Sequence, residues 1–129
     1  MGHSGRYRDG TGWEQRAGYS RAAREGDRIA VSGTTAHGPG DEVLHPGDAY
    51  RQTVVCLERA VAAVSKLGGG RESILRSRVY LVPEADWQDA ARAHADVLGD
   101  VAPANTMLYV HRLVGDGFLV EVELDAVVS

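Results

Sequence analysis

The clearest constraint on the fold is the strict alternation of residue types between Phe118 and Val128. One alternating set is entirely apolar and consists of Phe118, Val120, Val122, Leu124, Ala126 and Val128. The other set is mixed and consists of Leu119, Glu121, Glu123, Asp125 and Val127. Successive side chains of a strand point to opposite faces, so this period of two predicts a β-strand with one face in the core.

Two other segments carry the spacing of amphipathic helices. The first begins at Asp48, a candidate N-cap, and ends at the glycines of residues 68–70. The second begins at Asp86, another candidate cap, and runs to about Leu98. We therefore expect two helices, each with one face on a common core.

Four further segments are predicted strands, at residues 19–23, 28–33, 74–82 and 107–113. The turn residues Gly115–Gly117 predict that the fourth of these forms a hairpin with the last strand. The order β-β-α-β-α-β-β indicates an α+β fold with one mixed sheet backed by two helices. Residues 1–16 are polar and glycine-rich, and we interpret them as a mobile lead-in or an edge strand held by Trp13. Residues 17–129 form a single domain, because the chain has the length of one core.

Composition argues against several classes of function. The single cysteine, Cys56, permits neither an internal disulfide nor a cysteine zinc site, and we interpret it as an inert core thiol. No two histidines have the spacing of a helical metal pair, and no phosphate-loop motif is present, so we expect no metal and no cofactor. The net charge of −4 argues against a nucleic-acid partner. No apolar run reaches about 20 residues and no secretory pattern is seen, so the expected location is the cytoplasm, without a membrane partner.

The second face of the predicted sheet is half apolar. Its expected members are Arg76, Arg78, Tyr80, Glu121 and Glu123, together with Ile74 and Leu119. Such a face indicates burial against a partner subunit, although a solvated face is the alternative. Glu121 and Glu123 fit two roles, an acid and base pair or the partners of Arg76 and Arg78.

Six segments, read in order, carry a resemblance to one family. They are Gly18–Ser20, Gly26–Thr34, Gln52–Thr53, Arg78–Leu81, Pro103–Thr106 and Leu119–Ala126. Together they resemble the RidA/YjgF family of enamine and imine deaminases, whose older label is endoribonuclease L-PSP. The resemblance covers about Gly18 to Val128.

The resemblance implies a chorismate-mutase-like fold and a homotrimer whose sheets line a barrel, with small-molecule clefts between subunits. It also implies hydrolysis of an imine or enamine, in which water attacks the imine carbon and ammonia leaves. By position, Glu121 would help to place the water and Tyr19 would line the cleft. The strand end Ser32, Gly33 and Thr34 would line the same pocket, with Asn105 and Thr106 on the substrate.

Asn105 departs from the family pattern, because the P-A-R-[ST] segment of the family supplies an arginine at this place. An arginine offers a charged, two-pronged donor to a carboxylate, whereas asparagine carries no charge. Losing a hydrogen bond to a charged group weakens binding by about 10- to 100-fold. The main hypothesis is therefore a deaminase with a shifted substrate. The alternative is a non-catalytic small-molecule-binding trimer that acts as a sensor or a pathway partner.

Overall fold

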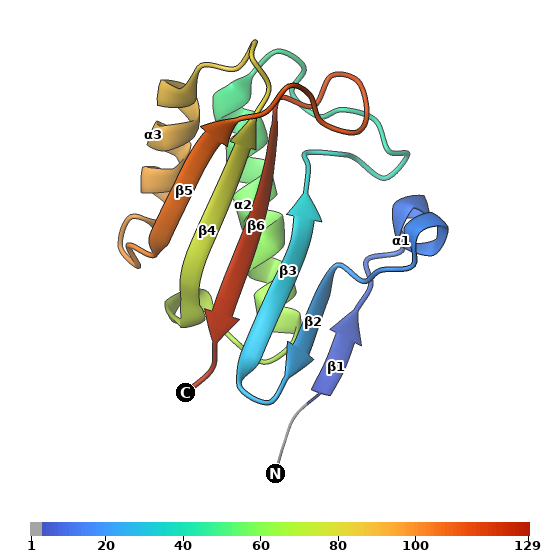
Figure 1. Cartoon of the computed structure of the whole chain (residues 1–129), viewed down its shortest axis with the longest axis vertical. Helices are drawn as coiled ribbons and strands as arrows, with labels where there is room; N and C mark the ends of the chain where they lie inside the picture. Colours follow the sequence, from blue (N-terminus) through green and yellow to red (C-terminus); the bar gives the residue numbers. More distant parts are fainter. Residues whose placement is uncertain (1–3) are drawn as a thin grey trace.

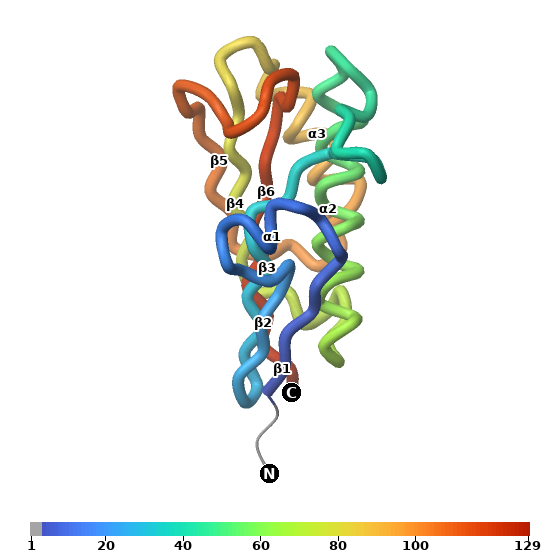
Figure 2. Tube along the Cα trace, turned by 90° about the vertical axis from the view of Figure 1, so that its right-hand side faces the viewer, coloured from blue at the N-terminus to red at the C-terminus, as the bar shows by residue number. Residues whose placement is uncertain are grey.

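A computed structural model describes residues 4–129 as two layers, a six-stranded sheet and a pair of long helices (Figures 1 and 2). The strands are β1 (Ser4–Tyr7), β2 (Ala22–Glu25), β3 (Arg28–Thr34), β4 (Ile74–Leu81), β5 (Ala104–Tyr109) and β6 (Val120–Val127). The helices are α1 (Gly12–Ala17), α2 (Ala49–Lys66) and α3 (Trp87–Leu98), with a 3-10 turn η1 at Arg71–Ser73. Helices α2 and α3 cover one side of the sheet, and residues 4–129 leave the other side, the open face, uncovered (Figure 2).

The sheet has the strand order β1-β2-β3-β6-β4-β5. All pairs are antiparallel except β4 and β5, which run parallel with Ser77 opposite Asn105. The predicted hairpin between the last two strands is therefore wrong, because β6 lies between β3 and β4. Helix α3 connects β4 to β5, and a crossover through a helix joins parallel strands. The predicted α+β class, with one mixed sheet backed on one face by α2 and α3, is confirmed.

Both predicted helix caps are present. The Asp48 carboxylate accepts from the backbone N–H of Arg51 at 2.9 Å, and the Asp86 carboxylate accepts from that of Gln88 at 2.9 Å. Such caps satisfy backbone donors that have no partner inside the helix. Helix α2 ends at Lys66, just before the glycines, and Gly68 has a φ of +93° that favours glycine.

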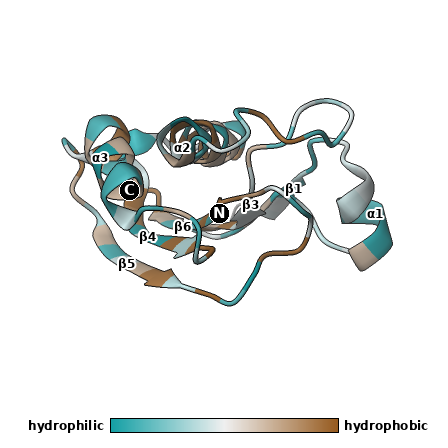
Figure 3. Cartoon of the chain, turned by 90° about the horizontal axis from the view of Figure 1, so that it is seen from above, coloured by the Kyte–Doolittle hydropathy of each residue, from teal (hydrophilic) through white to brown (hydrophobic). Residues whose placement is uncertain are grey.

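The core lies between the helices and the inner side of β6. The side chains of Val120, Val122 and Leu124 are fully buried there, together with Leu57 and Val64 of α2. Their alternation is the one that the sequence predicted for residues 118–128 (Figure 3 shows the sheet below α2 and α3). Burial of such side chains contributes about 1.5–3 kcal/mol each, so this strand anchors the sheet to the helices.

Two irregularities change which residues reach the open face. Between Ile74 and Arg76 the register of β4 against β6 shifts, so Ile74 is buried on the helix side and Leu75 is 57% exposed. The sequence prediction placed Ile74 on the open face, which is wrong because strict alternation cannot anticipate a bulge. A second shift, between Val31 and Thr34 of β3, bends the strand at Ser32 and Gly33.

The N-terminal residues form an edge strand and a short helix that joins it to β2. Strand β1 pairs with β2 in antiparallel register, and α1 follows beside the sheet edge (Figure 1). The helix α1 is an element that the sequence reading did not predict, since six residues are too few to show a helical period. The predicted strand at 19–23 is displaced to Ala22–Glu25. Residues 4–129 contain no helix with the length and hydrophobicity of a membrane span.

Candidate functional site

Glu121 is the most distinctive ionisable side chain on the open face. It lies on β6 and rests against the bend of β3, where its carboxylate occupies the space that a side chain at Gly33 would need. Burial raises its pKa, the neighbouring Glu123 raises it further, and Arg21 lowers it. Among residues 4–129, no protein donor forms a hydrogen bond with this carboxylate. Glu121 is thus a half-buried acid whose oxygens are available to water or a ligand.

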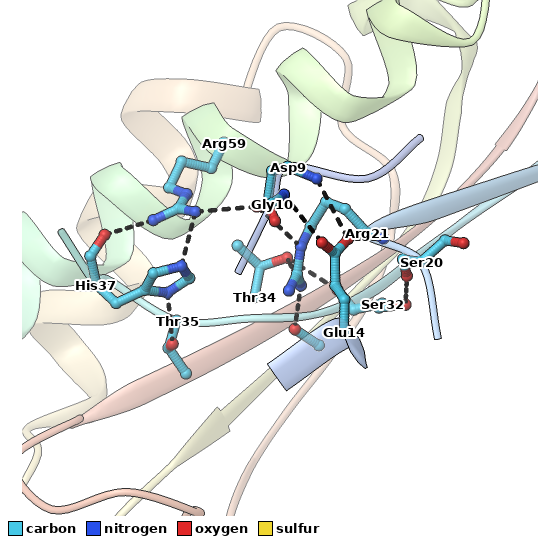
Figure 4. Close-up of polar contacts among 11 residues, drawn as sticks. Asp9, Gly10, Glu14, Ser20, Arg21, Ser32, Thr34, Thr35, His37 and Arg59 are labelled. Carbon is cyan, nitrogen blue, oxygen red and sulfur yellow. Dashed lines mark hydrogen bonds and ion pairs between the residues drawn. The ribbon is translucent and has the colours of Figure 1, made fainter. Parts of the chain in front are cut away.

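Arg21 organises the bend of β3 beside this carboxylate. Its guanidinium donates to the carbonyl oxygen of Gly33 at 2.5 Å and to Oγ1 of Thr34 at 3.2 Å. The ring of Tyr19 lies 5.7 Å from the guanidinium carbon, and Ser32 donates to the carbonyl oxygen of Ser20 at 2.6 Å. The predicted residues Tyr19, Ser32, Gly33, Thr34 and Glu121 are therefore gathered around one buried cation (Figure 4 shows the contacts of Arg21, Ser32 and Thr34).

The N-terminal segment is tied to this cation by two carboxylates. Asp9 forms an ion pair with the Arg21 Nε at 3.3 Å. Glu14 is buried and accepts from the backbone N–H groups of Asp9, Gly10 and Arg21 at 3.2, 3.0 and 2.9 Å (Figure 4). The sequence analysis did not identify Asp9, Glu14 and Arg21. The N-terminal segment is polar throughout, so no pattern in it predicts which carboxylates contact the sheet. The bonds of Glu14 and Asp9 fix the segment between β1 and β2, and the role of Trp13 at the edge strand stays a prediction.

A second group of polar side chains extends the network to α2. The Arg59 guanidinium donates to Asp9 at 3.2 Å, to the carbonyl oxygen of His37 at 2.5 Å and to its Nε2 at 2.9 Å. Burial, and then Arg59 and Arg21, lower the pKa of His37. A neutral ring that accepts at Nε2 carries its proton on Nδ1, which lies 3.2 Å from Thr35 Oγ1 and donates to it. His37 is thus a structural residue of this network.

The other charged groups of the open face are paired differently from the sequence expectation. The Tyr80 hydroxyl donates to Glu123, and Arg78 forms an ion pair with Asp125 at 3.1 Å. Neither glutamate forms an ion pair with Arg76 or Arg78 within the described residues. The two glutamates therefore have separate environments, and Glu121 is the one without a protein partner.

Asn105 lies far from Glu121 in the same chain. Its side-chain NH2 donates to Ser77 Oγ at 3.0 Å, and that hydroxyl lies 2.7 Å from Nε2 of His94 on α3. These contacts put Asn105 on the helix side of the sheet edge, whereas Glu121 is on the open face, and β4 lies between β5 and β6. Thr106 follows on the same edge strand and is exposed. The predicted site residues thus form two groups that do not meet within one chain.

Other reactive or metal-binding side chains are sparse. In the described part of the chain, no three His, Cys, Asp or Glu side chains gather as metal ligands. Cys56 is fully buried in α2, and burial raises the pKa of its thiol. Burial outweighs the opposing effect of Arg59, so the thiol stays protonated, and its place in the core is the one that the sequence predicted.

Comparison with known proteins identifies relatives of this chain in sequence and in structure. A family model described as endoribonuclease L-PSP matches residues 12–128. The Streptomyces coelicolor protein SCO2049 is 40% identical over 121 residues, which are 94% of this chain and 90% of that protein. Rv2704 from Mycobacterium tuberculosis, a member of the highly conserved YjgF/YER057c/UK114 family, is 32% identical with a TM-score of 0.87, over 98% of this chain and all of its own.

A more distant structure has the same fold. TdcF from E. coli, solved with bound serine, is 22% identical with a TM-score of 0.77, over 86% of this chain and 88% of its own. The ordered segments that first indicated the family lie within the matched range of residues 12–128. The chain belongs to the endoribonuclease L-PSP family, also named for YjgF, YER057c and UK114 and known as RidA.

Proposed function

We propose that the chain is a homotrimeric hydrolase of small imines or enamines, with its sites in clefts between subunits. The observation that carries the proposal is the half-buried Glu121 carboxylate, which has a raised pKa and no protein donor. Membership of the RidA/YjgF family supports the reaction class, because the family resemblance implies imine and enamine deamination.

A cleft between subunits would unite the two groups of site residues. Asn105 and Thr106 lie on β5, the edge strand, whose outer backbone groups have no strand partner among residues 4–129. Leu108 and Tyr109 on this strand are 41% and 48% exposed, which is unusual for large apolar side chains at an unpaired edge. When the β5 edge of one copy packs against the open face of the next, Asn105 of one copy approaches Glu121 of another.

The reaction requires one proton-transferring group beside a water molecule. The Glu121 carboxylate takes a proton from water as the oxygen attacks the imine carbon and passes it to the nitrogen, which gives a carbinolamine. It then moves the second proton from the new hydroxyl group to the nitrogen, as the carbonyl forms and ammonia leaves. The products are a carbonyl compound and ammonia, so atoms and charge balance without a redox partner. Burial raises the pKa of Glu121 towards neutral pH, so the populations of its protonated and deprotonated forms become more nearly equal there. A group that must both accept and donate a proton needs both forms.

Asn105 restricts the substrate that such a cleft would accept. It has no charge, and one N–H of its NH2 group is engaged by Ser77, so its carbonyl oxygen and its second N–H are left for a ligand. An uncharged amide that offers one acceptor and one donor favours a neutral amide-like group over a carboxylate, which an arginine would hold by charge. We therefore expect amide-bearing or neutral imines to be better substrates than imines of free amino acids.

The test is ammonia release from a panel of imines, which includes 2-aminoacrylate generated in place and its neutral amide. The wild-type protein should release ammonia, and Glu121→Gln should reduce the rate by about 100-fold or more, within the range for removal of a general base. Glu123→Gln is the matched control, because it lies two residues away and is held by Tyr80. A folded trimer that releases no ammonia from any imine would overturn the proposal.

The uncharged Asn105 also favours a second function, in which the trimer binds a small molecule and catalyses no reaction. In that case ligands would raise the melting temperature while ammonia release stays at the background rate. Asn105→Ala and Glu121→Ala should then abolish the ligand-induced shift. Unchanged shifts in both variants would exclude the proposed cleft as the binding site.

A further inference from the structure

One end of the open face carries a hollow that the proposed reaction does not use. It lies where β2 ends, β3 and β4 begin and β6 ends, at the lower end of the sheet in Figure 1. Its volume is about 530 Å³. Its lining includes Asp125 but excludes Glu121, which lies four residues earlier on β6, or about 13 Å along the strand. The hollow is therefore distinct from the proposed catalytic site.

Arginines dominate the lining, and two of them are held by a residue distant in sequence or by an ion pair. Arg24 donates to the carbonyl oxygens of Gly26 and Leu67 at 2.9 and 2.7 Å. Arg78 forms the ion pair with Asp125 at 3.1 Å. These contacts account for two of the five arginines that line the hollow.

The other three, Arg6, Arg28 and Arg76, form no ion pair within the described residues. Arg6 donates to the carbonyl oxygen of its neighbour Gly5, and this bond leaves its charge uncompensated. The Arg24 guanidinium is held by Gly26 and Leu67, which lie outside the lining, so we leave it out of the count. The other four arginines and two carboxylates, Glu25 and Asp125, give the hollow a local charge of +2. The chain as a whole carries −4, so positive charge is concentrated here against the overall balance.

The geometry of Arg28 and Arg76 allows them to share one ligand. Arg28 pairs with Val127 on one side of β6, and Arg76 pairs with Asp125 on the other. Two strands flanking a third are about 10 Å apart, a gap that two arginine side chains can bridge from both sides. The floor between them is apolar and includes Leu75 and Val127. Such side chains hold few water molecules beside the guanidinium groups, so a bound anion is screened less than in bulk water.

We propose that this hollow binds a small multivalent anion that carries phosphate or carboxylate groups. Arg28 and Arg76 grip the anion above Val127, and Arg6 adds charge at the rim. The planar guanidinium matches both kinds of oxyanion with two parallel hydrogen bonds.

The test is calorimetric titration of the full chain with pyrophosphate, inorganic phosphate and citrate, each compared with sodium chloride at equal ionic strength. At least one multivalent anion should bind saturably. The double variant Arg28→Gln/Arg76→Gln should bind it about tenfold or more weakly, because two charged hydrogen-bond donors are lost. Preference for pyrophosphate or for citrate tells which oxyanion the hollow recognises.

The matched control is Arg51→Gln/Arg92→Gln, which removes the same charge from exposed positions on α2 and α3. The affinity of this control for the anion should stay within about twofold of the wild-type value, since salt largely screens exposed charges on the helices from the open face. Glu121→Gln should also keep the anion, which separates failure here from failure of the proposed reaction. The proposal is overturned if no anion exceeds chloride, or if the control loses affinity as much as the double variant. Circular dichroism of each of these variants checks that the sheet is intact.

Discussion

Replacement of Asp9 by asparagine should cost more stability than its position in a polar N-terminal segment suggests. The carboxylate lies between two guanidinium groups, at 3.3 Å from Arg21 Nε and 3.2 Å from Arg59. The Arg21 side chain is 4% exposed and that of Asp9 is 15% exposed, so solvent screens this contact little. Removing one partner of a buried pair typically costs about 3–5 kcal/mol, because the remaining charge is uncompensated.

Two features reduce that cost for Asp9→Asn. Arg21 keeps its bonds to Gly33 and Thr34, and an asparagine oxygen still accepts a hydrogen bond. We therefore expect a loss of about 2–4 kcal/mol in the free energy of unfolding. Urea denaturation at pH 7, with protein concentration held fixed, should show a midpoint lowered by about 1–2 M at an unchanged slope.

The matched control for this prediction is Asp100→Asn. Asp100 pairs with Arg71, but their side chains are 72% and 42% exposed. Its loss should cost about 0–1 kcal/mol, as for most surface pairs. If Asp9→Asn proved no more destabilising than Asp100→Asn, the buried cation would not depend on Asp9, and our account of the N-terminal segment would be refuted.

Three further predictions concern the core and the candidate site. Leu124→Ala should lower the free energy of unfolding by about 2–5 kcal/mol in urea titrations, because the side chain is fully buried. Gly33→Ala should leave the fold intact by circular dichroism but displace the Glu121 carboxylate, so that ammonia release falls by about tenfold or more. The raised pKa of Glu121 means that the folded state favours the protonated acid, so its contribution to stability is present at acidic pH and lost as pH rises through the folded pKa. Glu121→Gln should accordingly be more stable than wild type at pH 7–8, with a difference that disappears below about pH 4 in urea midpoints.

Local patterns were enough to predict most of the fold. The alternation of residues 118–128 identified the buried strand, and Asp48 and Asp86 marked the starts of the two long helices. These features depend only on residues that are close in sequence, so they can be recognised from the sequence itself. The position of β6 between β3 and β4 depends on pairing between distant segments, and the adjacent turn residues misleadingly suggested a hairpin.

The candidate site was predictable only in part. Motif positions identified Glu121 and the β3 bend, but the cation beside them is Arg21, whose partners come from the N-terminal segment and from α2. The burial of Ile74 and the exposure of Leu75 depend on a bulge that leaves no mark in the residue pattern. The side of the sheet on which Asn105 lies follows from its parallel pairing with Ser77, a contact across 28 positions of the chain.

The most direct test of the central claim is a subunit-mixing measurement of ammonia release. Glu121→Gln and Asn105→Trp should each be nearly inactive alone while remaining trimeric by light scattering. Unfolded together in equal amounts and refolded, they should recover about a quarter of wild-type activity, since half of the clefts gain an intact Glu121 and half of those meet an intact Asn105. A mixture as inactive as its parents, beside an active wild type, would contradict a cleft shared between subunits.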